Sequence, residues 1–137
     1  METTVVLLKP DCIEKNLVGE VIKRFEDLGL RIRGCKMFNA SEALLKEHYS
    51  HLVDKPFFLE IIAFMQSSPI VALAIEGANS IASVRNHLGP TDSTMAPQGS
   101  IRGDYGTDKM RNIAHASDSS ESAAAEIRRF FVNSELF

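Results

Sequence analysis

The chain has 137 residues, of which 45% are hydrophobic and 24% are charged, with a formal net charge of −3. These values are typical of one soluble globular domain spanning residues 1–137, and they exclude low-complexity sequence and any global field that attracts nucleic acid or an anionic membrane. No apolar run is long enough to cross a bilayer, and the first predicted strand begins too early for a signal peptide, so we expect a cytoplasmic protein.

The N-terminal third predicts a strand, a helix and a second strand. The apolar run within Thr3–Leu8 is typical of a strand covered on both faces. Asn16 is placed to cap a helix with an apolar stripe, which Gly29 ends. Residues Leu30–Asn39 begin as an alternating strand, and the alternation slips near Gly34, which predicts a bulge. Two cysteines fall in or beside these elements without metal-ligand spacing, so we expect buried thiols at Cys12 and Cys35.

The middle of the chain predicts helices around a third strand. Ser41 is placed to cap one helix, and Phe57-Phe58 opens a second that Pro69 ends. Ile70–Ile75 is a fully apolar strand. Asn79 is placed to cap the helix that follows, which carries Arg85 on its polar side and ends at Gly89.

Residues 89–111 show no periodicity and are rich in glycine and proline. Unstructured segments of this length inside a small domain are usually functional or disordered. Because this loop lies between the helix carrying Arg85 and the segment carrying His115, we favour a functional role. It contains Thr91 and Arg102, whose hydroxyl and guanidinium groups suit phosphate oxygens.

The segment after this loop carries the strongest chemical signal. Asn112–His115 predicts a short buried strand, and Asp118 with Glu121 resembles a capping box at the start of a last helix. His115 would then lie beside a helix N-terminus, where anionic groups are favoured, and a histidine there can attack a phosphate. A partly buried structural histidine is the alternative, and local spacing alone leaves both interpretations open.

The predicted order of elements defines a fold class. Four strands and two main helices in the order β-α-β-β-α-β match the ferredoxin-like pattern. We therefore expect an α+β fold with a four-stranded antiparallel sheet and additional inserted helices.

The motifs together resemble the nucleoside diphosphate kinase family from Lys9-Pro10-Asp11 to Glu126. The most specific part is Asn112-Ile113-Ala114-His115-Ala116-Ser117-Asp118-Ser119, which is close to the family's signature around its phosphorylated histidine. Supporting segments stand in the family's order, namely His48-Tyr49, Pro56-Phe57-Phe58, Glu76-Gly77, Arg85, Leu88-Gly89, Thr91 and Ile101-Arg102-Gly103-Asp104.

The resemblance implies a ping-pong reaction through phosphohistidine. His115 would attack the γ-phosphate of a nucleoside triphosphate, typically ATP, and a nucleoside diphosphate would then take the phosphoryl group. By the same resemblance, Glu126 pairs with the other ring nitrogen of His115, and Ser117 bonds to Glu126. Such a partner would fix the tautomer that leaves a lone pair facing phosphorus.

The remaining site residues also follow from the resemblance. It implies that Lys9, Tyr49, Arg102 and Asn112 surround the transferred phosphate and the ribose hydroxyls. Arg85 and Thr91 would hold the outer phosphate of the diphosphate, and Phe57 would stack on the base with little base or sugar specificity. Mg²⁺ would bridge phosphate oxygens, with Asp118 touching it through water.

Three positions depart from the family's usual residues, namely Cys12, Ser93 and Met110. Ser93 lies in the loop that family members use in subunit contacts. The resemblance implies a homo-oligomer, either a tetramer or a hexamer, and leaves the choice open.

Two other functions fit this sequence less well. A phosphohistidine carrier would need no base platform or ribose donors, so Phe57 and Asn112 argue against it. An RNA-binding module of this fold should have aromatic strands and a basic sheet face, whereas these strands are aliphatic and the chain is acidic. We therefore expect no membrane and no specific nucleic acid among the partners.

Overall fold

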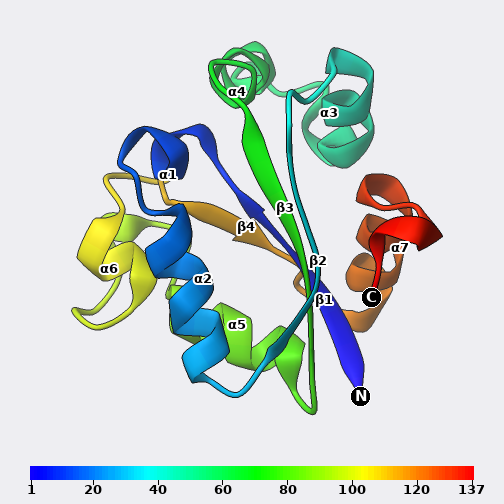
Figure 1. Ribbon diagram of the computed structural model, residues 1–137. Helices are drawn as coiled ribbons and strands as arrows, with labels where there is room; N and C mark the ends of the chain where they lie inside the picture. Colours follow the sequence, from blue (N-terminus) through cyan, green and yellow to red (C-terminus); the bar gives the residue numbers. More distant parts are fainter.

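A four-stranded antiparallel sheet in the order β2-β3-β1-β4 forms the centre of the computed structural model, which describes residues 1–137. The α+β ferredoxin-like prediction is confirmed, because β1 and β3 lie in the middle and the chain reaches them in the expected order (Figure 1). The strands are β1 (Glu2–Leu8), β2 (Arg31–Phe38), β3 (Ile70–Gly77) and β4 (Ala114–Ala116).

Helices cover both faces of the sheet. Figure 1 shows α2 and α5 on one face and α7 on the other, with α3 and α4 above one end of the strands. The α-helices are α1 (Pro10–Glu14), α2 (Val18–Asp27), α3 (Glu42–His48), α4 (Phe58–Met65), α5 (Ser80–Leu88), α6 (Ile101–Tyr105) and α7 (Ser120–Phe130). Short 3₁₀ turns lie at Ser50–Leu52, Ser93–Met95 and Asn133–Glu135. No helix combines the length and the apolar character needed to span a membrane.

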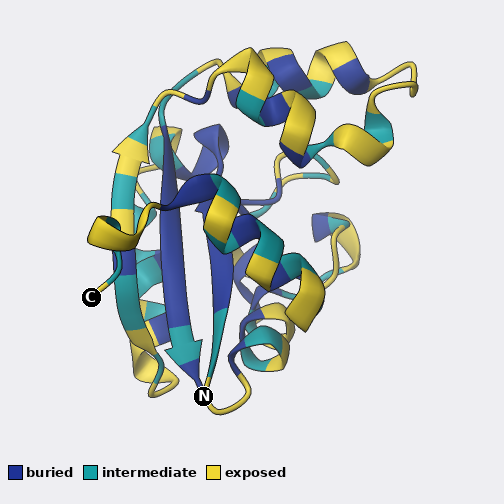
Figure 2. Cartoon of the chain, turned by 90° about the vertical axis from the view of Figure 1, so that its right-hand side faces the viewer, coloured by how far each residue is buried: buried dark blue, intermediate teal, exposed yellow.

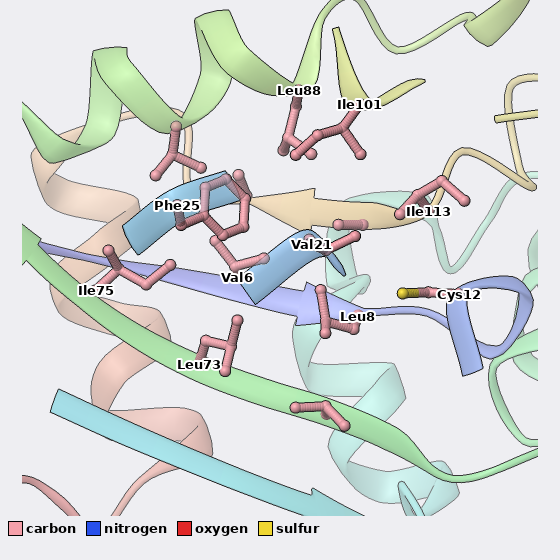
Figure 3. Close-up of a cluster of buried hydrophobic side chains, with 14 residues drawn as sticks. Val6, Leu8, Cys12, Val21, Phe25, Leu73, Ile75, Leu88, Ile101 and Ile113 are labelled. Atoms are coloured by element: carbon pink, nitrogen blue, oxygen red, sulfur yellow. The ribbon is translucent and has the colours of Figure 1, made fainter. Parts of the chain in front are cut away.

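The continuous apolar run of β1 is explained by this two-sided cover. Val6 and Leu8 belong to the main cluster with α2 and α5, while Val5 and Leu7 pack with Phe130 of α7. Alternate residues of a strand point to opposite faces, so both faces of β1 are apolar. Figure 2 shows the buried strands inside and the exposed helix surfaces outside, and Figure 3 shows the main cluster.

The α3–α4 hairpin, residues 42–65, has its own core. Leu45 of α3 packs with Phe58, Ile62 and Met65 of α4 in a cluster that touches the sheet through Ile70. Ser41 caps α3 as predicted, because its Oγ accepts a hydrogen bond from the Leu44 amide at 3.1 Å. The hairpin therefore forms a small unit with its own core, which packs against one end of the sheet.

Three predicted helix caps were wrong. Asn16 lies in the left-handed turn between α1 and α2, with φ of 57°, and α1 itself was not predicted. Asn79 occupies the predicted N-cap position of α5, but its side chain accepts no capping hydrogen bond, and the Ile81 amide donates to Glu2 Oε1 instead. The cap of α7 is Ser119, one residue after Asp118, because Ser119 Oγ accepts from the Ser122 amide at 3.1 Å. Only the error at α7 follows from adjacent residues that can both cap, because α2 begins without a side-chain cap and α5 receives its acceptor from distant Glu2.

The segment 89–111 is more ordered than its composition indicates. It contains a 3₁₀ turn and α6, which Ser100 caps by accepting from the Gly103 amide. A Cβ at Gly103 would lie 2.0 Å from the Pro97 carbonyl oxygen, so only glycine fits there. A five-residue helix that contains a glycine leaves no periodic signal in the sequence.

Of the remaining predictions, those about the bulge and the end of α2 are confirmed, and the one about the cysteines is partly wrong. The register of β2 against β3 shifts between Ile32 and Gly34, which confirms a bulge at this point, and Gly29 ends α2 with φ of 80°. Cys12 is buried, but Cys35 is exposed on β2, so the expectation of two buried thiols was wrong for Cys35.

Leu73→Ala tests the main cluster. Leu73 is fully buried on β3, so the substitution should lower the free energy of unfolding by about 2–5 kcal/mol through lost burial and a residual cavity. The measurement is urea denaturation followed by circular dichroism. The control is Met37→Ala on β2, which is 58% exposed and should change the free energy by roughly 0.5 kcal/mol or less. Equal losses in the two variants would contradict this account of the core.

Candidate active site

A cavity of about 560 Å³ lies where the ends of β1 and β4 meet the α3–α4 hairpin. Its wall is built from four parts of the chain that are distant in sequence, because the antiparallel pairing of β1 with β4 brings the end of one strand to the start of the other. Nine of the eleven predicted site residues line it: Lys9, Tyr49, Phe57, Arg85, Thr91, Arg102, Asn112, His115 and Asp118. The other two, Ser117 and Glu126, stand behind His115.

His115 is held by a chain of hydrogen bonds. Its Nε2 lies 3.1 Å from both carboxylate oxygens of Glu126, and Ser117 Oγ donates to Glu126 Oε1 at 2.6 Å. Ser117 is anchored in turn, because its Oγ accepts from the Val5 amide of β1 at 3.1 Å. The chain therefore ties the orientation of the imidazole to the central strand.

The charge on Glu126 fixes the tautomer of His115. Burial alone would raise the pKa of Glu126, but the hydrogen bonds from His115 and Ser117 lower it overall, so the carboxylate is ionised at neutral pH. An ionised carboxylate only accepts hydrogen bonds, so Nε2 of His115 carries the proton. In the neutral ring, the lone pair is then on Nδ1.

A strained turn precedes His115. Ile113 is fully buried with φ of 78°, and the Ala114 amide donates to the Asn112 carbonyl at 2.9 Å, which together form a γ-turn of the rare positive-φ type. Both polar groups of Ile113 are clamped, because its amide donates to Asp11 Oδ2 at 2.9 Å and its carbonyl accepts from the Lys9 amide at 2.9 Å. Figure 3 shows the Ile113 side chain in the main cluster, so packing also holds the turn.

Lys9 is a buried cation at the end of β1. Its ammonium group donates to the Met110 carbonyl at 2.6 Å and to Asn112 Oδ1 at 2.9 Å. Burial lowers the pKa of Lys9 from 10.5 to about 8, although Asp11 opposes this shift. An ammonium has three donors, so one remains for a ligand in the cavity.

Arg102 fastens the 89–111 segment to β4. Its guanidinium donates to the carbonyls of Asn112, Gly89 and Ala114 at 3.1, 2.8 and 2.6 Å. A guanidinium has five N–H groups, so two remain for an anion. Burial, followed by the nearby charge of Arg85, lowers the pKa of Arg102 to about 10, and the group stays charged at neutral pH.

Asn112 is also engaged with its own chain. Its amide nitrogen donates to the carbonyls of Thr91 and Lys109 at 3.0 Å each, while its oxygen accepts from Lys9. The two predicted donors Arg102 and Asn112 therefore shape the cavity in addition to lining it.

The mouth of the cavity is formed by less buried side chains. Phe57 is 44% exposed at the start of α4, and Arg85 donates to the Ala116 carbonyl at 3.2 Å from α5. Thr91 is exposed and contributes its backbone carbonyl to Asn112. Tyr49, which follows α3, faces the same space, and burial raises the pKa of its hydroxyl to about 12.

Sequence reasoning gave no role to His48 or Asp11. The ring of His48 stands perpendicular to that of His115, with centroids 4.6 Å apart. No local signal brings α3 to β4, so this contact follows only from the tertiary fold. The signal for Asp11 was present, since this carboxylate lies three residues after the end of β1 and two residues after Lys9.

The three departures from the family's usual residues have different surroundings. Cys12 is fully buried in the main cluster. Ser93 is buried in the 89–111 segment with no partner for its Oγ. Met110 lines the cavity, and its carbonyl accepts the hydrogen bond from Lys9.

Two groups of side chains in or beside the cavity carry atoms of the kind that bind metal ions. Nitrogens of His48 and His115 and an oxygen of Glu126 lie within 4.8 Å of one another. This cluster is a poor site for a cation, because Nε2 of His115 carries a proton that it donates to Glu126. Asp118 lines the cavity and has an oxygen that accepts from Ser122 Oγ at 2.7 Å, which lowers the pKa of its carboxyl.

Asp11→Ala tests the clamp on Ile113. The substitution leaves a buried amide without an acceptor and should lower the free energy of unfolding by about 1–3 kcal/mol, while Asp11→Asn keeps an acceptor oxygen and should lose less. Urea denaturation measures both. Glu14→Ala, an exposed carboxylate on the same helix, is the control and should be nearly neutral. If Asp11→Ala behaved like Glu14→Ala, the clamp would have no energetic role.

Comparisons with known proteins agree with this geometry. The family model described as nucleoside diphosphate kinase matches residues 2–136. The nucleoside diphosphate kinase of Staphylothermus marinus is 48% identical over 98% of this chain and 96% of its own length. Among solved structures, the Aquifex aeolicus nucleoside diphosphate kinase has a TM-score of 0.93 at 42% identity, with 99% of each chain covered. A Halobacterium salinarum nucleoside diphosphate kinase in complex with CDP has a TM-score of 0.96 at 40% identity, covering 99% of this chain and 91% of that one. The chain therefore belongs to the nucleoside diphosphate kinase family.

Proposed function

We propose that His115 is the residue that carries the phosphoryl group in this nucleoside diphosphate kinase. The enzyme transfers the γ-phosphate of a nucleoside triphosphate to a nucleoside diphosphate, as its family does. The observation that carries the assignment of His115 is its hydrogen bond to Glu126. With the proton on Nε2, the lone pair of Nδ1 is available as a nucleophile in the cavity wall.

The reaction then proceeds in two matched halves. In the first, Nδ1 of His115 attacks the γ-phosphorus, a P–N bond forms, and the bond from phosphorus to the bridging oxygen breaks. The nucleoside diphosphate leaves with that electron pair. The ring becomes cationic, and the Glu126 carboxylate stabilises this charge through the Nε2–H bond. In the second half, a terminal oxygen of another diphosphate attacks the phosphorus and the P–N bond breaks.

The charge of the cavity supports binding of a polyphosphate. Four cationic side chains and only two acidic ones line it, although the whole chain has a net charge of −3. Phosphoryl transfer depends mainly on positioning and charge stabilisation. We assign Lys9 and Arg102 to the transferred phosphate, and Arg85 with Thr91 to the outer phosphate of the diphosphate.

The nucleoside end of the cavity has few base-specific groups. We assign Phe57 as the stacking platform and Asn112 with Tyr49 to the neighbourhood of the sugar and the transferred phosphate. Stacking accepts any base, because every base has a π-face. The Halobacterium relative was solved in complex with CDP, which supports a site that accepts a pyrimidine base.

Mg²⁺ fits a cavity that provides few oxygen ligands of its own. Only Glu60 and Asp118 contribute carboxylates to the wall. Magnesium keeps several waters and binds phosphate oxygens readily, so two carboxylates are enough. We propose that Asp118 contacts it through water, and that the ion neutralises phosphate charge when it is bound.

The alternative of a phosphohistidine carrier has less support. His115 is recessed in a cavity with a stacking surface, whereas a carrier must present its histidine to a partner protein. The homo-oligomer, tetramer or hexamer, is proposed on the family resemblance, and the exposed Met95 in the 89–111 segment supports a contact there. The cytoplasmic location stays a prediction.

His115→Asn tests the nucleophile. Incubation with γ-labelled ATP and Mg²⁺ should give wild-type enzyme an acid-labile, alkali-stable label that any nucleoside diphosphate removes. The variant should keep its circular dichroism spectrum and take up no label. His51→Asn, which changes an exposed histidine, should label normally. A labelled His115→Asn enzyme would move the phosphoryl group to another residue.

The pH dependence of nucleotide binding tests Lys9. Because burial lowers its pKa to about 8, the free enzyme loses this positive charge above pH 8, and the dissociation constant for a non-hydrolysable ATP analogue, which carries the phosphate assigned to Lys9, should rise between pH 8 and 9. Isothermal titration calorimetry measures this constant. Lys9→Met should bind roughly 10- to 100-fold more weakly at pH 7, through loss of a charge-assisted hydrogen bond, and should show no rise between pH 8 and 9. An equal rise in both proteins would assign the titration to another group.

A further inference from the structure

Arg129 connects helix α7 to the ring that stands against His115. It lies three residues after Glu126, so the two side chains project from the same face of α7. Its Nη1 lies 3.0 Å from Nδ1 of His48, the last residue of α3. The carboxylate that orients His115 and the guanidinium that reaches His48 thus come from one helix.

The chemistry of the guanidinium decides the direction of this hydrogen bond. Arginine has no acceptor and stays charged, so Arg129 donates and Nδ1 of His48 accepts. A neutral His48 must then carry its proton on Nε2. A doubly protonated His48 would place an N–H group against an N–H group and would lose the bond.

His48 is enclosed by groups that disfavour a positive charge. The rings of His115, Tyr49 and Phe130 pack around it with centroids 4.6, 4.7 and 5.1 Å away. Burial, followed by His115, lowers the pKa of His48 to about 3. Arg129 and His51 act in the same direction, and only Glu126 opposes them.

No close carboxylate competes with His48 for a hydrogen bond from Arg129. Its Nε is buried without a hydrogen-bond partner, and Glu47 is 3.7 Å from this atom with a side chain 64% exposed. The side chain of Arg129 itself is 17% exposed. Its only side-chain hydrogen bond is the one to His48.

We propose that Arg129 is a positioning residue that keeps the proton of the neutral His48 ring on Nε2, beside the nucleophile His115. This inference rests on the proposed role of His115. With its proton on Nδ1, His48 would have an unprotonated Nε2, which is a second acceptor for the Nε2–H group of His115, because ligand atoms of His48, His115 and Glu126 lie within 4.8 Å of one another. With the proton of His48 on Nε2, Glu126 stays the acceptor for His115, and Nδ1 of His115 stays directed at the phosphate.

Nuclear magnetic resonance of ¹⁵N-histidine-labelled enzyme tests the tautomer directly. The chain has four histidines, so the ring signals can be assigned by single substitutions. At pH 7 the wild-type enzyme should show His48 as the Nε2–H tautomer. In Arg129→Met this preference should disappear, and the titration midpoint of His48 should rise by about one unit or more, as expected for the loss of a nearby like charge.

Matched variants separate positioning from a general effect of charge. Arg128→Met removes an exposed arginine from the same helix and should leave the His48 signals unchanged. Arg129→Lys keeps one charged donor and should retain the Nε2–H tautomer. Circular dichroism checks that each variant is folded.

The rate of phosphoenzyme formation tests the consequence. Arg129→Met should slow this step roughly 10-fold, because small misplacements of a reacting group are costly, while the dissociation constant for ADP stays within about twofold. The double variant His48→Phe/Arg129→Met should form phosphoenzyme at the rate of His48→Phe alone, since the effect of Arg129 passes through His48.

Three results would overturn the proposal. The first is a wild-type His48 with its proton on Nδ1. The second is an Arg129→Met enzyme that matches Arg128→Met in both the spectra and the rate. The third is a further slowing when Arg129→Met is added to His48→Phe. A wild-type enzyme that takes up no phosphate on His115 would instead refute the proposed function, and the tautomer of His48 would still be measurable.

Discussion

The hydrogen bonds that run from β1 through Ser117 and Glu126 to His115 are the contacts on which the site depends most. Each hydrogen bond fixes the orientation or the protonation of the next group. The Val5 amide orients the Ser117 hydroxyl, the hydroxyl holds one oxygen of Glu126, and the carboxylate keeps the proton of His115 on Nε2. Buried networks of this kind are stable only when every member is satisfied. The position of a single ring nitrogen is therefore set by the packing of the central strand.

Several side chains of the cavity wall both hold the fold together and face the ligand space. Most hydrogen-bonding groups of Arg102, Asn112 and Lys9 already bind backbone carbonyls, and Lys9 also donates to Asn112. These contacts close the 89–111 segment over β4 and immobilise the same cations and amide that a nucleotide would meet. A ligand then loses little entropy in ordering them, which is the benefit of a preorganised site. The strained turn at Ile113 is held by the same neighbourhood, since Lys9 and Asp11 clamp its backbone from both sides.

The sequence predicts the strands well and the contacts between distant segments poorly. Strands such as the one at Ile70–Ile75 could be predicted, because an apolar run is a feature of local composition. The cap of α7 was misplaced by one residue because Asp118 and Ser119 are both good capping residues, and only the packed helix selects between them. The family resemblance supplied Glu126 and the other site residues, whereas His48 and Arg129 meet through α3 and α7, which no spacing rule joins. Helix α6 was missed because it has only five residues, one of them a glycine that packs against the Pro97 carbonyl, so it has no amphipathic pattern.

Burial differs between the two ends of the cavity. Lys9 and Arg102 stand on or beside the sheet and are 8% and 6% exposed, whereas Phe57, at the start of α4, is 44% exposed. A nucleotide with its phosphates at the buried end would therefore place its base at the open end. A one-ring or a two-ring base would extend toward solvent by different amounts, while the distance from the nucleophile to phosphorus would stay the same. Tolerance toward the base would then come from the open end of the cavity and not from a movement of the catalytic groups.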